Sequence, residues 1–132
     1  MDFVSVRLIT DDVEGMVAFY ERVLGLETRW GTEDFAEVVT PSCTLAIGQT
    51  RTVRLFGEGA ARPADNHTAI VEFRVDDVDK EHERLKDFVG EFVKEPTTMP
   101  WGNRSLLFRD PDGNLINFFT PVGADAVRRF ER

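Results

Sequence analysis

The sequence predicts an α+β fold made of two tandem copies of one βαβββ module. The first observation is an internal repeat: residues 6–13 (V-R-L-I-T-D-D-V) recur as residues 71–78 (V-E-F-R-V-D-D-V), 65 positions later in a chain of 132 residues. The second is that each copy begins with alternating apolar and polar residues. The third is that apolar residues at helical spacing follow each alternating stretch. Two similar halves are therefore expected.

The alternating stretches predict β-strands that bury one face. In the first copy Val6 and Leu8 form the expected buried face, and Ser5 and Arg7 point the opposite way. The second copy alternates in the same manner, with Val71, Phe73 and Val75 on the buried face and Ile70, Glu72 and Arg74 on the other. Each copy should thus present polar side chains on the face away from its core.

A helix is predicted after each of these strands. Asp11 and Asp76 are the expected N-terminal caps, and Gly25 and Gly90 are the expected stops. The apolar stripe of the second helix is narrower and lies among many charged residues. We therefore expect the second helix to be the more exposed of the two.

Three further strands are predicted in each copy, at residues 27–30, 36–40 and 43–47 and at residues 91–95, 105–109 and 115–119. The run D-P-D-G-N at residues 110–114 predicts a turn, because proline sets the first central φ and glycine accepts a positive one. We expect a single domain, residues 1–132, with module 1 at about residues 1–57, a linker at about 57–67 and module 2 at about 68–122.

Composition and charge exclude several classes of function. The chain has 24 acidic and 16 basic side chains, a net charge of −8, which disfavours nucleic acid and anionic membranes as partners. Cys43 is the single cysteine and cannot form an internal disulfide. The first residues form neither a signal peptide nor a membrane span, so we expect a cytoplasmic protein.

Three motifs resemble those of the vicinal-oxygen-chelate superfamily, which contains glyoxalases, bleomycin-resistance proteins and dioxygenases. They are F-Y-E-R-V-L-G-L at residues 19–26, F-R-D-P-D-G-N-L at residues 108–115 and M-P-W-G-N-R at residues 99–104. The last run is similar to the bleomycin-resistance branch in particular. This resemblance implies a cupped mixed sheet with the helices on its convex face and a ligand held in the cup.

The same resemblance implies where the metal enzymes of the superfamily hold their ion. The corresponding positions here are Ser5, Ala46, Ile70 and Asn117. Alanine and isoleucine have no donor atom, whereas a divalent catalytic site needs about three His or carboxylate ligands. His67 and His82 are expected to be surface residues without companions. The sequence therefore predicts no metal and no cofactor, and disfavours glyoxalase or dioxygenase activity.

The residues expected to face a ligand are Ser5, Arg7, Glu72, Arg74, Trp101, Asn117 and Phe119. They combine a few polar groups with aromatic rings, as small-molecule sites do. The alternative is that Arg7 and Glu72, at equivalent positions of the two copies, pair with each other. Trp30 and Phe35 are expected in the core or at an interface rather than at the ligand.

The leading hypothesis is a homodimeric small-molecule binding protein of the drug-sequestering kind, with a cationic or aromatic ligand. The alternative is a metal-independent lyase or isomerase, in which Glu72 acts as the general base and Arg7 or Arg74 stabilises an oxyanion. A third hypothesis is a regulatory or assembly module without a ligand. The sequence leaves open whether the protein is an enzyme.

Overall fold

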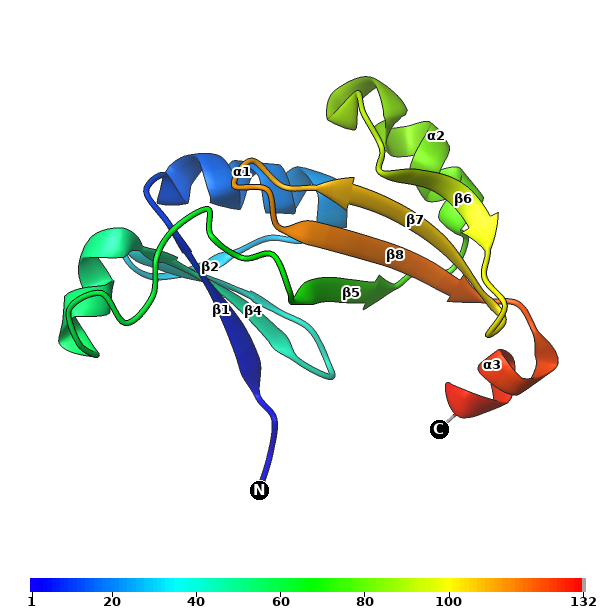
Figure 1. Ribbon diagram of the computed structural model, residues 1–132, viewed down its shortest axis with the longest axis horizontal. Coiled ribbons are helices and arrows are strands. Elements are labelled where there is room, and N and C mark those ends of the chain that lie inside the picture. The colour runs from blue at the N-terminus through cyan, green and yellow to red at the C-terminus, as the bar shows by residue number, and fades with distance from the viewer. Residues whose placement is uncertain (132) are drawn as a thin grey trace. The chain divides into compact units, whose positions relative to one another are not determined.

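The computed structural model describes residues 1–131 and confirms the α+β class, with two four-stranded mixed sheets in the described chain (Figure 1). The first copy consists of β1 (Ser5–Thr10), α1 (Val13–Leu24), β2 (Arg29–Thr32), β3 (Phe35–Val39), β4 (Thr44–Gln49) and the 3-10 helix η1 (Thr50–Leu55). The second consists of β5 (Ile70–Arg74), α2 (Val78–Val89), β6 (Lys94–Thr98), β7 (Asn103–Arg109), β8 (Leu115–Pro121) and α3 (Ala124–Arg129).

The chain packs as two compact units. Unit 1 contains Met1–Asn66 together with Asp110–Gly113, and unit 2 contains His67–Arg109 together with the described chain from Asn114 onward. The turn between β7 and β8 therefore packs with the first unit, although the strands that it joins belong to the second. No helix of residues 1–131 is long and apolar enough to cross a membrane.

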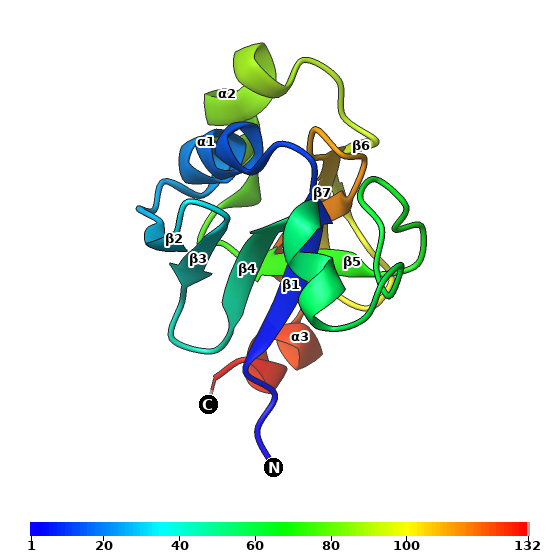
Figure 2. The same ribbon diagram turned by 90° about the vertical axis from the view of Figure 1, so that its left-hand side faces the viewer.

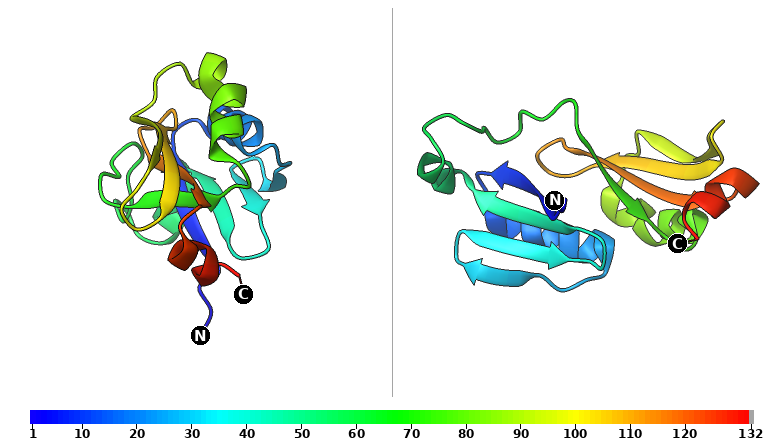
Figure 3. Two further views of the ribbon diagram at one scale, coloured as in Figure 1. Left: turned by 90° about the vertical axis from the view of Figure 1, so that its right-hand side faces the viewer. Right: turned by 90° about the horizontal axis from the view of Figure 1, so that it is seen from below.

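Both sheets have the same topology, which confirms the repeat. The strand order is β1-β4-β3-β2 in unit 1 and β5-β8-β7-β6 in unit 2. In each sheet the first strand pairs in parallel with the last, and the remaining pairs are antiparallel. Figure 2 shows the strands of unit 1, and Figure 3 shows its helix α1 lying along one side of the sheet.

Helix α1 is held at both ends by local contacts. The Asp12 carboxylate accepts a hydrogen bond from the Gly15 N–H at 3.0 Å, and Gly25 ends the helix with a φ of +64°. Asp77 caps α2 in the same way. The predicted caps, Asp11 and Asp76, were each one residue too early, because the helices begin only at Val13 and Val78.

Helix α1 contributes more buried residues to the core of unit 1 than α2 contributes to the core of unit 2. Five residues of α1 are buried, namely Val13, Met16, Val17, Tyr20 and Val23, whereas only Val78 and Leu85 are buried in α2. The prediction that the second helix is the more exposed one is confirmed.

Tyr20 brings a polar atom into the core of unit 1 and finds an acceptor there. Its hydroxyl donates a hydrogen bond of 2.7 Å to Asp110, in the turn that packs with unit 1. Burial, followed by the neighbouring Asp110 carboxylate, raises the pKa of Tyr20, so the hydroxyl stays protonated and remains a donor. This hydrogen bond ties the D-P-D-G turn to α1.

Strand β6 starts later than the sequence predicted. The prediction was residues 91–95, but the strand spans Lys94–Thr98. The preceding residues form the connection from the helix: Glu91 N–H bonds to the carbonyl of Val89, and Val93 N–H reaches the carbonyl of Leu107 at 2.8 Å. The elements η1 and α3 were not predicted at all.

Candidate functional site

Each sheet has one face packed on its helix, and we call the other its open face. Residues paired directly across neighbouring strands share a face, so the registers define it. In unit 1 a row on the open face runs from Arg7 through Ala46 to Glu37. In unit 2 the equivalent row runs from Glu72 through Asn117 to Leu107. Ala46 and Asn117 therefore occupy the same place in the two sheets.

Arg7 lies against two aromatic rings on the open face of unit 1. Its guanidinium carbon is 4.7 Å from the ring centre of Phe35 and 5.2 Å from that of Phe56, both within the range of cation–π attraction. Among residues 1–131, no hydrogen bond or ion pair of the Arg7 side chain is found within unit 1. Phe35 was expected in the core or at an interface, and Phe56, which follows η1, was not singled out by any sequence pattern.

Glu72 and Asn117 contact each other on the open face of unit 2. The Asn117 Nδ2 donates a hydrogen bond of 2.8 Å to a Glu72 carboxylate oxygen, while Glu72 itself is exposed. The other amide atom, Asn117 Oδ1, is buried and has no hydrogen-bond partner in the described chain. A buried acceptor of this kind usually has a donor, either from the protein or from a bound molecule.

Arg74 and Phe119 lie near the C-terminal segment, an arrangement that the sequence did not reveal. Phe119 is only 8% exposed, and its ring centre is 5.3 Å from that of Phe130. Arg74 donates a hydrogen bond of 3.0 Å to the Phe130 carbonyl and its guanidinium carbon lies 5.6 Å from that ring. The sequence could not place Phe130, because the contact joins residues far apart in the chain.

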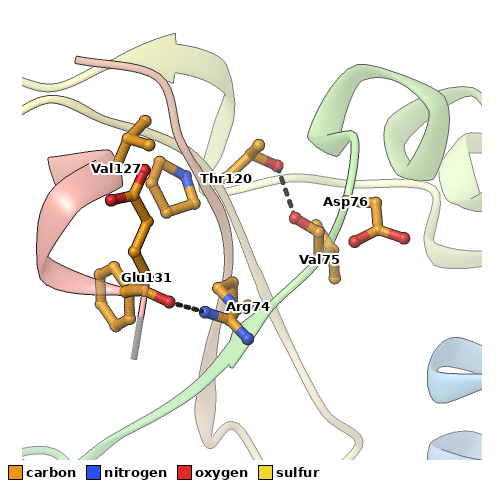
Figure 4. A pocket seen from close by; sticks show the side chains of 8 residues that line it. Arg74, Val75, Asp76, Thr120, Val127 and Glu131 are labelled. Carbon is orange, nitrogen blue, oxygen red and sulfur yellow. Dashed lines mark hydrogen bonds between the residues drawn. The ribbon is translucent and has the colours of Figure 1, made fainter. Parts of the chain in front are cut away.

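A pocket of about 240 Å³ opens beside Arg74 in unit 2 (Figure 4). The residues that line it are Arg74, Val75, Asp76, Thr120, Pro121, Val127, Phe130 and Glu131. The Thr120 hydroxyl donates to the carbonyl of Val75 at 2.9 Å, which fixes one wall. One cationic side chain, Arg74, and two carboxylates, Asp76 and Glu131, line this pocket. Its charges therefore favour neither anionic nor cationic ligands.

Trp101 lies in the turn between β6 and β7 and is 67% exposed. The turn is held in place through its backbone: the Gly102 carbonyl accepts hydrogen bonds of 2.9 Å from the N–H groups of Val122 and Gly123. Gly102 has a φ of +92°, and a Cβ added there would lie 3.3 Å from the Gly123 Cα. A fixed backbone thus presents an exposed indole ring.

The positions that correspond to metal ligands in the superfamily carry poor donors. Ser5 is exposed and offers one hydroxyl, and Asn117 offers one amide oxygen. Ala46 is buried and Ile70 is 48% exposed, and neither has a donor atom. In the described part of the chain, no group of three or more His, Cys, Asp or Glu side chains is arranged to hold a metal ion. This donor set does not fit a catalytic divalent metal.

His67 is exposed, as expected, whereas His82, also expected at the surface, is partly buried, with 19% of its side chain exposed. Its ring lies 4.8 Å from that of Phe92, edge to face, and its Nε2 is 3.9 Å from a Glu95 carboxylate oxygen. The reason is that Phe92, in the connection to β6, packs back onto α2, which the hydrophobic pattern of the helix alone did not indicate.

Comparison with known proteins agrees with this architecture. The chain is 27% identical over 131 residues to the uncharacterised protein YraH of Bacillus subtilis, covering 90% of this chain and 98% of YraH. A glyoxalase/bleomycin resistance protein/dioxygenase from Nocardioides has a similar solved structure, with 25% identity, a TM-score of 0.76 and coverage of 94% of this chain and 85% of that one.

A family enzyme from Burkholderia phytofirmans PsJN shares the fold at 19% identity, with a TM-score of 0.79 and coverage of 92% of this chain and 100% of the other. Residues 2–118 match the sequence profile described as the Glyoxalase/Bleomycin resistance protein/Dioxygenase superfamily. The match includes both copies of the module and the D-P-D-G-N turn. The chain therefore belongs to the glyoxalase/bleomycin resistance protein/dioxygenase superfamily.

Proposed function

We propose that this protein binds a small organic molecule without a divalent metal, on the open face of unit 2. The ligand presents a hydrogen-bond donor, such as an amine or amidinium group, to Glu72 and Asn117. Trp101 lies beyond the start of β7, at least four residues or roughly 13 Å along the strand from Leu107 beside Asn117, so it adds an aromatic surface for the far end of a longer ligand. The proposed physiological setting is the sequestration of a toxic compound, as in bleomycin-resistance proteins.

The observation that carries this proposal is the buried Asn117 Oδ1 without a donor. An unsatisfied buried acceptor costs about 1–3 kcal/mol, which a ligand N–H can recover. The same amide donates to Glu72, so one fixed side chain positions a carboxylate beside a free acceptor. Two acceptors side by side, one of them charged, favour a cationic donor. The net charge of −8 favours the same ligand class.

The metal-free part of the proposal rests on the donor set. Ala46 and Ile70 supply no ligand atom, so Ser5 and Asn117 alone would have to hold the ion. We expect that zinc, nickel, iron and manganese, each offered in excess, are lost on dialysis against a chelator. Elemental analysis of the dialysed protein measures this. One ion retained per chain and required for ligand binding or turnover would contradict the proposal.

Benzamidine, a planar cation, is a suitable probe, with benzamide as its neutral counterpart. Calorimetry should show benzamidine binding roughly tenfold tighter than benzamide, and Asn117→Ala and Glu72→Gln should each remove most of that preference. Glu91→Gln is the matched control, because it removes the same charge from an exposed position of unit 2. Equal binding of both probes, or an equal effect of Glu91→Gln, would overturn the assignment.

We also propose that the protein forms a homodimer. All four residues of the edge strand β2 are exposed, and Trp30 within it is 44% exposed. An exposed edge with an aromatic side chain favours pairing with a second copy in a two-fold arrangement. Light scattering at high micromolar concentration should give twice the chain mass of 15.0 kDa. The monomer mass at that concentration would contradict the dimer.

A further inference from the structure

We propose that Arg7 anchors the carboxylate of a planar organic acid on the open face of unit 1. This site consists of residues of unit 1 only, and the proposal does not depend on the ligand proposed for Glu72 and Asn117. Its parts are the Arg7 guanidinium, on β1, and the rings of Phe35, on β3, and Phe56, after η1.

Unit 1 offers the Arg7 N–H groups no acceptor. Its partner on the adjacent strand β4 is Ala46, which has no polar side-chain atom. Glu37 lies in the same row, on β3, but the guanidinium lies against Phe35 of that strand, and no hydrogen bond or ion pair joins Arg7 to Glu37 in the described chain. Arg51 differs in this respect, because Asp34 accepts hydrogen bonds from its guanidinium. No group of unit 1 therefore uses the N–H donors of Arg7, which leaves them for a ligand.

Two aromatic rings hold the Arg7 guanidinium. The guanidinium carbon lies over two rings, and cation–π attraction to them needs no hydrogen-bond acceptor. The two rings therefore restrict the position of the Arg7 group, whose five N–H donors have no acceptor in unit 1. A carboxylate is the acceptor that matches this fork, because its two oxygens accept two parallel hydrogen bonds.

The rest of the ligand has an exposed aromatic ring to pack against. Phe56 is 69% exposed, so a flat apolar body attached to the carboxylate has a ring surface to contact. The protein is acidic overall, but exposed charges farther apart than about 8 Å are largely screened at physiological salt. The bidentate contact acts at hydrogen-bond distance and decides the charge of the ligand at this site.

Benzoate, with benzamide as its neutral isostere, tests the proposal by calorimetry and by amide NMR shifts. We expect saturable millimolar binding of benzoate, with shifts on β1 and around Phe56, and roughly tenfold weaker binding of benzamide. Arg7→Met keeps an unbranched apolar stem but removes the charged fork, and should abolish the preference for benzoate. Arg54→Met is the matched control, because Arg54 is exposed on η1 and its loss changes the net charge equally.

Several results would overturn this assignment. They are no saturable benzoate binding at tens of millimolar, equal affinity for benzamide, or an equal loss of benzoate affinity in Arg54→Met. A stability coupling between Arg7→Met and Glu72→Gln in a double-mutant cycle would instead show that Arg7 serves an ion pair. Arg7→Met should still bind benzamidine, because that probe binds at Glu72 and Asn117. This measurement distinguishes a failure of one proposal from a failure of the other.

Discussion

The open faces of the two units show how one repeated module presents opposite charges at the same place. Arg7 and Glu72 are 65 positions apart and lie in equivalent rows. The Glu72 carboxylate accepts a hydrogen bond from Asn117, whereas Ala46, in the place of Asn117, offers Arg7 nothing. The repeat thus determines where a charged group lies, and the neighbouring strand determines whether the unit itself satisfies it.

The helix sides of the two units differ in a similar way. Tyr20 of α1 and Leu85 of α2 are 65 positions apart, and both are buried. Leu85 needs no partner, but the Tyr20 hydroxyl needs an acceptor, which Asp110 supplies from the turn that packs with unit 1. The Tyr20 hydroxyl therefore binds the turn between β7 and β8, whereas Leu85 of α2 has no polar side-chain atom that needs such a contact.

The largest expected effect is that of Tyr20→Phe on stability. It removes a 2.7 Å hydrogen bond to a buried carboxylate, so we expect the free energy of unfolding to fall by about 3 kcal/mol. Urea denaturation measures the change. Leu85→Met at the equivalent position of α2 is the control and should cost less than about 1.5 kcal/mol. A cost for Tyr20→Phe no larger than that of the control would mean that the hydrogen bond does not distinguish the units.

A smaller effect is expected for Trp101→Ala on binding. The β2–β3 turn of unit 1 carries no aromatic residue, whereas the equivalent turn of unit 2 presents the exposed Trp101. Affinity for an aromatic amidine long enough to span the roughly 13 Å along β7 from Asn117 to the turn should fall by about 1–2 kcal/mol, roughly 5- to 30-fold. Stability should change by less than about 0.5 kcal/mol. Unchanged affinity, or a stability loss of several kcal/mol, would refute a ligand-contacting role.

The smallest effect is expected for Asp112→Asn. Burial, together with the nearby Asp110, Asp11 and Asp12 carboxylates, raises the pKa of Asp112, although the Thr10 hydroxyl opposes this. A raised carboxyl pKa contributes stability below the usual value of about 4 and loses it as the pH rises through the folded-state pKa. The Asn variant should therefore be more stable at pH 7, by less than about 1 kcal/mol.

Melting curves across pH test this expectation, because the advantage of Asp112→Asn should vanish below about pH 4, where Asp112 is protonated in both states. The turn between β3 and β4 in unit 1 contains Pro41 and Ser42 and no acidic residue, so Ser42→Ala serves as a pH-independent control. A gain that persists at low pH would show that the carboxylate charge is not its cause.

Much of the fold could be predicted from the sequence because local patterns determine it. The alternation indicated the buried face at Leu8, whereas the equivalent face at Phe73 is only partly buried, and the glycines at 25 and 90 marked the ends of the helices. The element α3 could not be predicted, because its six residues depend on contacts with a turn and a strand that the local pattern does not contain.

The candidate site was only partly predictable for the same reason. Alternation placed Arg7, Glu72 and Arg74 on the open faces, but it could not indicate which partner each would meet. Phe56 and Phe130 contact arginines that are far away in the sequence, and no spacing points to either ring. The Glu72–Asn117 hydrogen bond depends on the register of β5 against β8, which a single sequence does not specify.

The measurement that tests the central claim most directly is native mass spectrometry of the purified protein, compared with its denatured mass and its metal content. Metal-free binding of a small molecule predicts an added organic mass that denaturation releases, with no stoichiometric metal. The added mass should decrease in Asn117→Ala, which removes the acceptor carrying the proposal. A retained divalent metal, or an organic mass that Asn117→Ala and Arg7→Met both leave unchanged, would contradict the account.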